Sequence, residues 1–385
     1  MQILFLTTLL PGARHTGSEV ATQGFVDGLR ELGHRVRLMA YRRAGASPPL
    51  HEDDRPVADR HIETSAAGVH AALWMARALA TRRPYSVAKY VSRDYRLAMD
   101  AELRDEPPGL VIVDHASMGW LMPPGGWPVP HVYIAHNVEH HVYEQLAAEG
   151  GRRQWANARE APLIRGCEES LCRSARSVWT LTEGEAATLA EMGAGERARS
   201  FDLPGTAAAP EPAGDATCDV ATLGSWTWKS NAAGLVWFLS EVRPLLPPGL
   251  RVEVGGAASR ELSAGTQGVT AHGRVPDAMS FLQSARVVAV PSVTGAGVQV
   301  KTLDAISTGR AVVASETAMR GISDPPPTMR VAGDPAAFAA AIQDALAAPP
   351  SEADALAAQA WARDRRVRFR DQLSTALDEI GGPAA

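Results

Sequence analysis

Short apolar runs alternate with amphipathic segments along most of the chain. The first run, Gln2–Thr8, predicts a buried strand. A loop at 9–17 follows, and Ser18 is a residue type that often caps the N-terminus of a helix. Apolar side chains then recur at helical spacing and predict one buried stripe: Ala21, Phe25, Leu29 and Leu32. Gly33 ends this predicted helix, and 34–40 is the next predicted strand.

The same alternation continues through both halves of the chain. In the first half, further strands are predicted at 110–115, 131–137 and 177–182. In the second half, strands are predicted at 219–225, 251–256 and 269–273, and at both ends of the segment 285–315, and helices at 231–242, 276–284, 335–348 and 351–380. Strands and helices in alternation indicate parallel sheets with helices on both faces.

A Pro-, Ala- and Gly-rich stretch without periodicity, 204–217, indicates a linker between two domains. We therefore expect an α/β protein with two doubly wound Rossmann-like domains, at 1–203 and 218–365. A C-terminal helix at 366–385 is expected to pack back on the first domain. Ligands of such sheets bind beyond the carboxyl ends of the strands, so we expect the two domains to face a cleft that holds the active site.

Composition narrows the class of protein. The 385 residues are 45% apolar and 21% charged, as in an ordinary globular protein, and a formal net charge of −5 gives no reason to expect a nucleic-acid partner. No apolar run approaches the ~20 residues that span a bilayer, and the N-terminal segment lacks the basic start of a signal peptide. The spacing of the three cysteines fits neither a disulfide framework nor a zinc site. These observations predict a cytoplasmic protein.

The segment 285–315 carries the clearest chemistry: strand, Gly-rich loop, helix and strand. Gly295 and Gly297 allow a phosphate to approach the backbone, and the N–H groups at Gly297 and Val298 point to an anion at a helix N-terminus. Lys301 adds a positive charge for a diphosphate. Asp304 can accept hydrogen bonds from both hydroxyls of a ribose. The alternative is that Lys301 and Asp304 form an ordinary surface pair three residues apart.

Two more strand ends in the second half supply polar groups. Gly224 and Ser225 offer backbone donors, and Lys229 offers a charge. Arg274 can contact phosphate, and the backbone of Val275 can read the edge of a base. Two tryptophans in the same segment as Lys229 either stack a ligand or pack in the core: Trp226 and Trp228.

Polar residues also follow the predicted strands of the first half. The loop before the first helix ends in Gly17 and Ser18, and His136 follows a strand. Histidines at strand ends orient sugar hydroxyls or fill structural hydrogen bonds. The residues expected on the acceptor side are Ser18, His115, Asn137 and Glu139. No DxD motif stands in a plausible site, so we expect no metal.

The segment His70–Arg96 interleaves tryptophan and tyrosine with arginine and lysine. One interpretation is a docking face for an acidic acceptor, a carrier protein or a membrane surface. The other is a solvated helix face whose aromatic side chains turn to the core.

Three of these segments resemble the retaining glycosyltransferases of the GT-B fold, the large family that includes sucrose synthase and bacterial mannosyltransferases. LGSWTWKSNAAGLVWFLSEV at 223–242 is similar to the family stretch G-S-M-x-W-x-P-N, with Ser230 where Pro is common. HGRVPDAMSFLQSARVVAVPS at 272–292 resembles its base-binding segment. GAGVQVKTLDAISTGRAVVAS at 295–315 resembles GGGxxxKxLEAMAxGxPVV.

The resemblance implies roles for single residues. The backbone at Arg274 and Val275 meets the base, and Asp304 stands where the family has a ribose-binding Glu. His136 and Gly17 match a strand-end His and a first-loop Gly near the donor. Many members carry a further Glu that touches the donor sugar; Ala296 stands there in this chain.

The resemblance also implies the reaction. A hexose moves from a nucleotide diphosphate sugar, UDP type favoured, to a small-molecule, lipid-linked or carrier-bound acceptor. The anomeric configuration is retained, the leaving diphosphate acts as base, and no cofactor is needed beyond the donor itself as co-substrate. His136, Lys301 and Lys229 are the residues expected to act in catalysis. Two alternatives remain open: a non-catalytic GT-B scaffold protein, and a nucleotide-sugar 2-epimerase.

Overall fold

The computed structural model describes residues 1–13, 16–45, 50–61, 67–151, 153–206, 215–295 and 297–381. The chain divides into two compact units, Met1–Phe201 with Phe369–Ala385, and Asp202–Arg368. The sequence analysis predicts domains at 1–203 and 218–365 with a linker between them, and the second compact unit includes that linker segment. Of the expected linker, 207–214 lies outside the described residues.

The first unit contains a seven-stranded sheet in the order β3-β2-β1-β4-β5-β6-β7, and every pairing in it is parallel. Ile3 of β1 pairs with Val36 of β2 and with Leu110 of β4, so β1 lies between them. The strand order reverses there, as in doubly wound folds. The strands are β1 Gln2–Leu9, β2 Arg35–Arg43, β3 Asp54–Arg60, β4 Leu110–Asp114, β5 His131–Ile134, β6 Ser177–Thr180 and β7 Ala198–Ser200.

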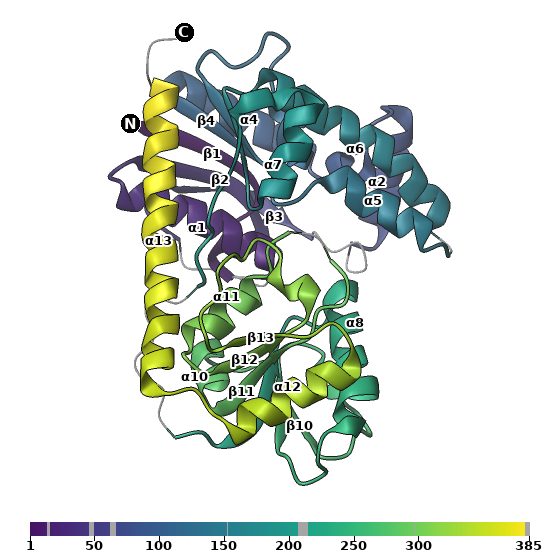
Figure 1. The fold of residues 1–385 in the computed structure, drawn as a ribbon. Coiled ribbons are helices and arrows are strands. Elements are labelled where there is room, and N and C mark those ends of the chain that lie inside the picture. Colours follow the sequence, from purple (N-terminus) through teal and green to yellow (C-terminus); the bar gives the residue numbers. More distant parts are fainter. Residues whose placement is uncertain are drawn as a thin grey trace. The chain divides into compact units, whose positions relative to one another are not determined.

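The α-helices of this unit join the strands of its sheet (Figure 1). They are α1 Gly17–Glu31, α2 Val69–Ala80, α3 Tyr85–Ala88, α4 Arg93–Asp105, α5 Glu139–Ala148, α6 Gln154–Ser174 and α7 Glu183–Leu189. The first helix starts earlier than the sequence suggests. Its N-cap is Thr16, whose side chain accepts the N–H of Glu19, so Ser18 is not the cap and is free for another contact.

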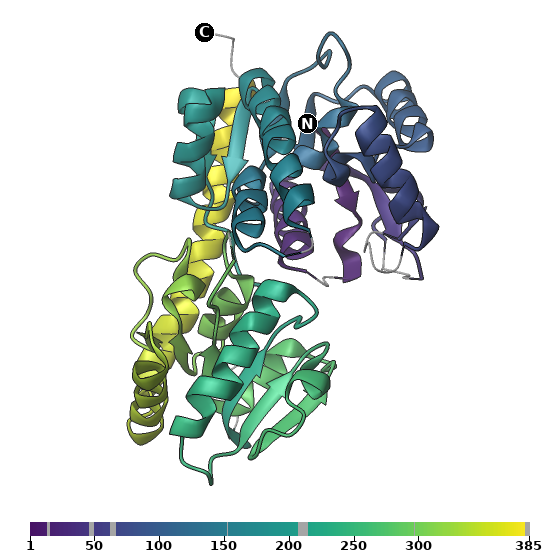
Figure 2. The ribbon, with the colours of Figure 1, turned by 90° about the vertical axis from the view of Figure 1, so that its right-hand side faces the viewer.

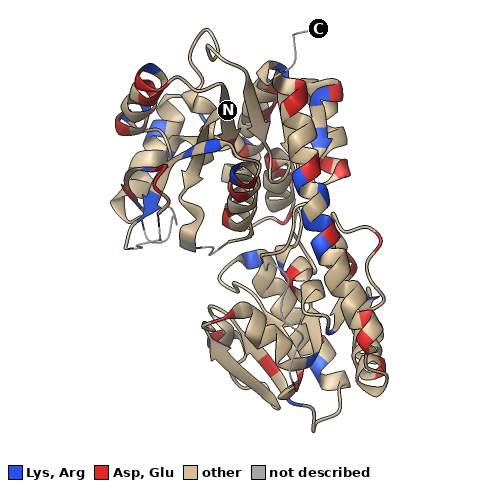
Figure 3. Ribbon diagram, turned by 90° about the vertical axis from the view of Figure 1, so that its left-hand side faces the viewer, with Lys and Arg blue, Asp and Glu red and all other residues tan. Residues whose placement is uncertain are grey.

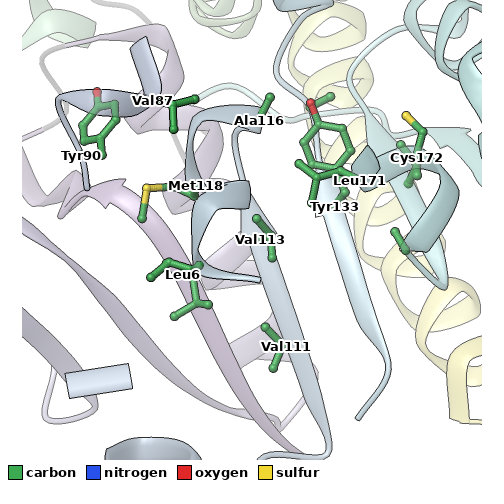
Figure 4. Close-up of a cluster of buried hydrophobic side chains, with 14 of the residues drawn as sticks. Leu6, Val87, Tyr90, Val111, Val113, Ala116, Met118, Tyr133, Leu171 and Cys172 are labelled. Carbon is green, nitrogen blue, oxygen red and sulfur yellow. The ribbon is translucent and has the colours of Figure 1, made fainter. Parts of the chain in front are cut away.

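Apolar side chains of β1, β4 and β5 form one face of the core of the first unit. Figure 4 shows Leu6 and Val113 on neighbouring strands, with Met118 beside them and Tyr133 and Leu171 farther along the cluster. All five are fully buried or nearly so. Buried parallel strands read as continuous apolar runs, which is why these strands were recognisable in the sequence.

The second unit contains a six-stranded parallel sheet in the order β10-β9-β8-β11-β12-β13. Its strands are β8 Cys218–Leu223, β9 Val252–Gly255, β10 Val269–Gly273, β11 Ala285–Val290, β12 Ala311–Ala314 and β13 Met329–Val331. Its helices are α8 Lys229–Trp237, α9 Ser259–Leu262, α10 Ala278–Gln283, α11 Val300–Ser307 and α12 Pro335–Ala347. The predicted start of α8 at 231 was two residues late. Both units are doubly wound, as the sequence predicts.

Helix α13, Glu352–Gly381, matches the helix predicted at 351–380 and runs without a break through residue 366, where the sequence analysis places a domain boundary (Figure 2). Within the first unit, Phe369 contacts Phe25 and Phe201, at ring-centroid distances of 5.3 and 6.2 Å. Gly28 of α1 permits this packing, since a Cβ there would lie 2.6 Å from Leu373. Acidic residues lie toward both ends of α13, and its arginines are grouped in its middle (Figure 3). Among the described residues, no helix has the length and apolar character to cross a membrane.

Candidate functional site

In the second unit, the predicted donor-binding residues follow strands that end at one edge of the sheet. Gly224 and Ser225 follow β8, Arg274 and Val275 follow β10, and Gly295 lies in the loop after β11. The carboxyl ends of parallel strands share an edge, which brings these loops to the same side of the sheet. This edge is the expected position for a ligand in an open α/β sheet.

Lys301, in the first turn of α11, is held among neutral groups. Its Nζ donates to Asn231 Oδ1 at 3.3 Å and lies 5.8 Å from the centre of the Trp226 ring. Asn231 in turn donates to the Ser225 carbonyl at 3.1 Å, which ties the loop after β8 to this cation. Burial lowers the pKa of Lys301 to about 8. Lys301 is therefore not part of a solvated surface ion pair. A bound anion would offset the free-energy cost of burying its charge.

The two described glycines of the loop after β11 have backbone torsions that favour glycine. Gly295 and Gly297 have φ of 125° and 75°, in the region that favours glycine. The Gly295 carbonyl accepts from the guanidinium of Arg320. Val298 is partly buried. Ala296, which stands where the family has its sugar-contacting Glu, lies outside the described residues.

Asp304 makes a contact that sequence reasoning missed. Its Oδ1 accepts both the N–H of Thr206, at 2.6 Å, and the Thr206 hydroxyl, at 2.8 Å. Gly205 is equally close, since a Cβ there would lie 2.9 Å from the same oxygen. The carboxylate thus anchors the start of the linker, and its ribose role stays a prediction.

The other charged candidates of the second unit are exposed: Lys229 at the start of α8, and Arg274 after β10. The two tryptophans in the same segment as Lys229 differ in burial. Trp226 is buried and donates from Nε1 to the Gly255 carbonyl at 2.7 Å, so it packs in the core. Trp228 is 53% exposed.

In the first unit, a buried aspartate that the sequence analysis did not single out organises the strand ends. Asp114 is the last residue of β4 and is fully buried. Its Oδ1 contacts His136 Nε2 at 2.6 Å, and its Oδ2 accepts the hydroxyls of Thr7, at 2.6 Å, and Thr22, at 2.7 Å. Burial by itself raises the pKa of Asp114, but the two neighbouring histidines and these hydrogen bonds lower it well below the usual range. Asp114 is therefore a carboxylate.

His136 and His115 stack, with ring centroids 4.1 Å apart and planes at 28°. Burial lowers the pKa of His115 to about 4, so this ring is neutral at pH 7. His115 Nε2 lies 3.0 Å from the Ser18 hydroxyl, which brings two predicted acceptor-side residues together. Gly17, beside Ser18, is the exposed first residue of α1.

The second ring nitrogen of His136, Nδ1, is buried and has no hydrogen-bond partner in the described structure. Because Nε2 faces the Asp114 carboxylate, we assign the proton to Nε2 in the neutral ring. Nδ1 then accepts a hydroxyl proton, and in the protonated ring it donates. Nδ1 is therefore a buried polar atom whose hydrogen-bonding capacity is unfilled among the described residues.

Two further buried carboxyl groups, Glu139 and Glu185, interact electrostatically with His136. Glu139 accepts the N–H of Ala116 at 3.1 Å, and burial, with the charge of Glu168, raises its pKa to about 7. Glu168 accepts the backbone N–H groups of Glu139 and His140 at 2.7 and 3.3 Å, which fixes the start of α5. Burial likewise raises the pKa of Glu185 to about 7, and its Oε2 lacks a hydrogen-bond partner among the described residues.

Sequence reasoning found the histidines of this cluster but missed three of the polar residues that surround them: Asp114, Glu168 and Glu185. For Asp114 a signal existed, because it ends an apolar strand run directly before His115. For Glu168 and Glu185 there was none, since both lie in ordinary polar helix patterns. Asn137 follows His136 and is partly buried.

Two groups of side chains in the described residues have the spacing of metal ligands: Asp114, His115 and His136, and also His140, His141 and Glu144. In the first group, the Asp114 oxygens already accept hydrogen bonds from two threonines and from His136. Hydrogen bonding therefore accounts for this group without an ion.

Two doubly wound α/β units are the architecture of the GT-B fold, and in the second unit a Gly-rich loop precedes the helix that carries the partly buried Lys301. Comparison with known families gives the class directly. A family model described as "Glycosyl transferase 4-like domain" matches residues 16–200, and one described as "Glycosyl transferases group 1" matches residues 217–348. The chain belongs to the group 1 glycosyl transferases and is a glycosyltransferase. A search of curated proteins finds no match.

Solved structures agree on the fold. Sucrose-phosphate synthase from Thermosynechococcus elongatus has a TM-score of 0.62 at 15% identity, covering 98% of this chain and 97% of that one. Anabaena Alr3699/HepE, solved with UDP-glucose, has a TM-score of 0.62 at 14% identity, covering 98% and 99%. The UDP-forming trehalose-phosphate synthase of Burkholderia xenovorans, in complex with glucose-6-phosphate, has a TM-score of 0.61 at 14% identity, covering 99% and 100%.

These matches confirm the predicted family, fold and enzyme class. The scaffold and epimerase alternatives gain no support from them. The roles of single residues stay predictions.

Proposed function

We propose that this glycosyltransferase moves a hexose from a UDP-type nucleotide diphosphate sugar to an acceptor hydroxyl, without a metal ion and with retention of the anomeric configuration. The observation that carries the proposal is Lys301, a partly buried cation held by neutral partners beside a Gly-rich loop at a strand end. Such a cation is prepared for a diphosphate. The structural neighbours support the UDP type, because one was solved with UDP-glucose and another is named as UDP-forming.

In the proposed reaction, the acceptor oxygen forms a bond to the anomeric carbon on the face from which the diphosphate departs. The bond between that carbon and the diphosphate oxygen breaks, and the acceptor proton passes to the leaving diphosphate. The protein's task is to stabilise the charge that builds up on the diphosphate. Lys301 and the N–H groups at Gly297 and Val298 do this, and the exposed Lys229 adds a further charge.

In this proposal, His136 forms a hydrogen bond to the donor hexose. Its Nδ1 is buried and lacks a partner among the described residues, and Asp114 fixes the ring from the other side. A hexose hydroxyl that donates to Nδ1 would satisfy this atom. His115 is neutral at pH 7, so it adds no positive charge next to the sugar.

The acceptor is proposed as a small molecule, a lipid-linked molecule or a carrier-bound group. A cytoplasmic location is proposed because nucleotide sugars are intracellular donors in the implied reaction. The three cysteines, Cys167, Cys172 and Cys218, are free, which fits a reducing compartment.

Calorimetry with UDP, GDP and ADP, in the presence of EDTA, tests the donor proposal. We expect selective binding of UDP, weakened in Lys301→Ala and unchanged in Lys89→Ala, which removes a lysine from the first unit. No binding of any nucleotide, or equal loss in both variants, would refute the proposed role of Lys301. With a UDP-sugar that turns over, NMR of the first product gives the anomeric configuration. An inverted product would refute retention.

A further inference from the structure

Helix α2 exposes large apolar side chains to solvent, which is unusual for a surface helix. Of its residues, Ala78 alone is buried. Val69, Leu73 and Leu79 are 75%, 61% and 52% exposed. A surface helix of a globular protein ordinarily turns such residues to the core and polar residues to solvent. A run of large exposed apolar side chains on one helix marks a contact site.

The charged residues in this helix and in the stretch of sequence around it are all basic. From Thr64 to Arg93 the sequence has no Asp or Glu, although the whole chain has a net charge of −5. The same stretch carries Arg77, Arg82, Arg83, Lys89 and Arg93, and the four arginines are exposed. None of these five forms an ion pair with an acidic residue in the part of the chain that the structure describes. The charge of the stretch is therefore available to a partner.

The aromatic residues of the stretch do not provide the contact. Tyr90 and Tyr95 are buried, and Trp74 contacts Tyr85 edge to face at 6.3 Å. The second interpretation made from the sequence, aromatic side chains turned to the core, thus describes the tyrosines. What the helix offers to solvent is aliphatic surface and arginine.

Helix α6 contributes one more apolar group near the end of α2. Arg159 of α6 donates to the Ala78 carbonyl at 2.9 Å and to the Arg83 carbonyl at 3.2 Å, which holds the two helices together (Figure 1). Trp155, one helical turn before Arg159, is 63% exposed. An exposed tryptophan beside arginines is typical of side chains that sit at the level of lipid headgroups.

We propose that α2 is a docking surface for an anionic phospholipid bilayer. We call it the α2 surface and define it by Val69, Leu73, Arg77, Leu79, Arg82 and Arg83. The aliphatic side chains enter the boundary between headgroups and acyl chains, and the arginines meet lipid phosphates. The helix lies on the membrane and does not cross it.

Other occupants fit these observations less well. A second copy of the chain would bring the same basic stretch, which has no Asp or Glu from Thr64 to Arg93 to pair with these arginines. An acidic protein partner would pair with the arginines. It would not explain why the apolar side chains of Val69 and Leu73 are exposed on the same helix. A bilayer accepts both the apolar face and the positive charge, and needs no shape match.

Co-sedimentation of the full chain with vesicles tests the proposal. We expect binding to vesicles of phosphatidylcholine mixed with phosphatidylglycerol, and little binding to phosphatidylcholine alone. Binding should weaken as salt shortens the Debye length from ~30 Å at 0.01 M to ~3 Å at 1 M. Arg82→Glu with Arg83→Glu should weaken binding at least about tenfold.

Matched variants distinguish binding through the α2 surface from general effects of net charge or hydrophobicity. Arg363→Glu with Arg370→Glu changes the net charge equally, at exposed residues of α13, and should leave vesicle binding intact. Leu73→Ser should weaken binding, whereas Leu356→Ser, at a 52% exposed leucine of α13, should not.

Three results would overturn the proposal. The first is equal binding to neutral and anionic vesicles, and the second is equal loss in the α13 controls. The third is an Arg82→Glu, Arg83→Glu protein that binds vesicles normally but loses affinity for a soluble acidic partner. Vesicle binding needs no turnover, so its failure is distinguishable from failure of the proposed reaction.

Discussion

Replacing Asp114 by asparagine removes the charge that orients His136 while keeping the shape of the side chain. Asp114 accepts three short hydrogen bonds, from Thr7, Thr22 and His136, and all three partners are buried. The asparagine can satisfy the threonines by rotation of their hydroxyls. It holds His136 less well, because a neutral amide either accepts more weakly from Nε2 or donates to it. In the second case the ring changes tautomer, and Nδ1 becomes a donor.

A hydrogen bond to a charged group is worth about 1.5–3 kcal/mol. If it acts in the transition state, its loss lowers kcat/KM by about ten- to a hundredfold, since each 1.36 kcal/mol is tenfold. We expect this loss in Asp114→Asn, with UDP affinity unchanged, because the proposed nucleotide contacts lie in the other unit. The assay is steady-state kinetics across pH, together with UDP calorimetry.

The matched control is Glu160→Gln. Glu160 is a buried carboxylate of the same unit that accepts the N–H groups of Tyr85, at 2.8 Å, and Ser86, at 3.3 Å. Its variant should lose stability to a similar degree but keep its activity below the melting transition. A double-mutant cycle with His136→Asn should show strong coupling to Asp114. Additive losses, or an equal loss of activity in Glu160→Gln, would show that Asp114 is only structural.

Four further outcomes are expected. Lys301→Ala should weaken UDP binding by about 1.5–3 kcal/mol, and Lys301→Arg should restore part of it; unchanged calorimetry would argue against phosphate contact. Asp304→Asn should lower nucleotide affinity more than Thr206→Val does; equal effects would assign Asp304 to the linker alone. The pKa of His115 is about 4 in the folded state against 6.5 unfolded, so the unfolded chain binds more protons between these values. Stability should then fall as pH drops from 6.5 to 4, by less in His115→Asn, as thermal melts would show. The pKa of Glu139 is raised to about 7, so its contribution to stability is present below about pH 4.5 and lost as pH rises through 7. Glu139→Gln should therefore be the more stable protein at pH 8, and a less stable variant would contradict the assigned burial.

Sequence alone was enough for the fold, the family and the position of the Gly-rich loop, because each depends on local pattern. Buried parallel strands appear as apolar runs, and a Gly-rich turn before a helix needs its glycines at positive φ, as at Gly295 and Gly297. The candidate histidines were also visible, since they directly follow predicted strands. Exact helix starts were less accurate: Thr16, not Ser18, caps α1.

Only the tertiary structure revealed the partners that decide what those residues can do. Asp114 accepts hydrogen bonds from Thr7, Thr22 and His136, which come from three different places in the chain, and no local pattern records such convergence. In the same way, Lys301 meets Asn231 across 70 positions in sequence. The α2 surface shows the converse. Its apolar composition predicts burial, and only the packing of the unit determines that, among the described residues, no neighbour buries these side chains of the helix.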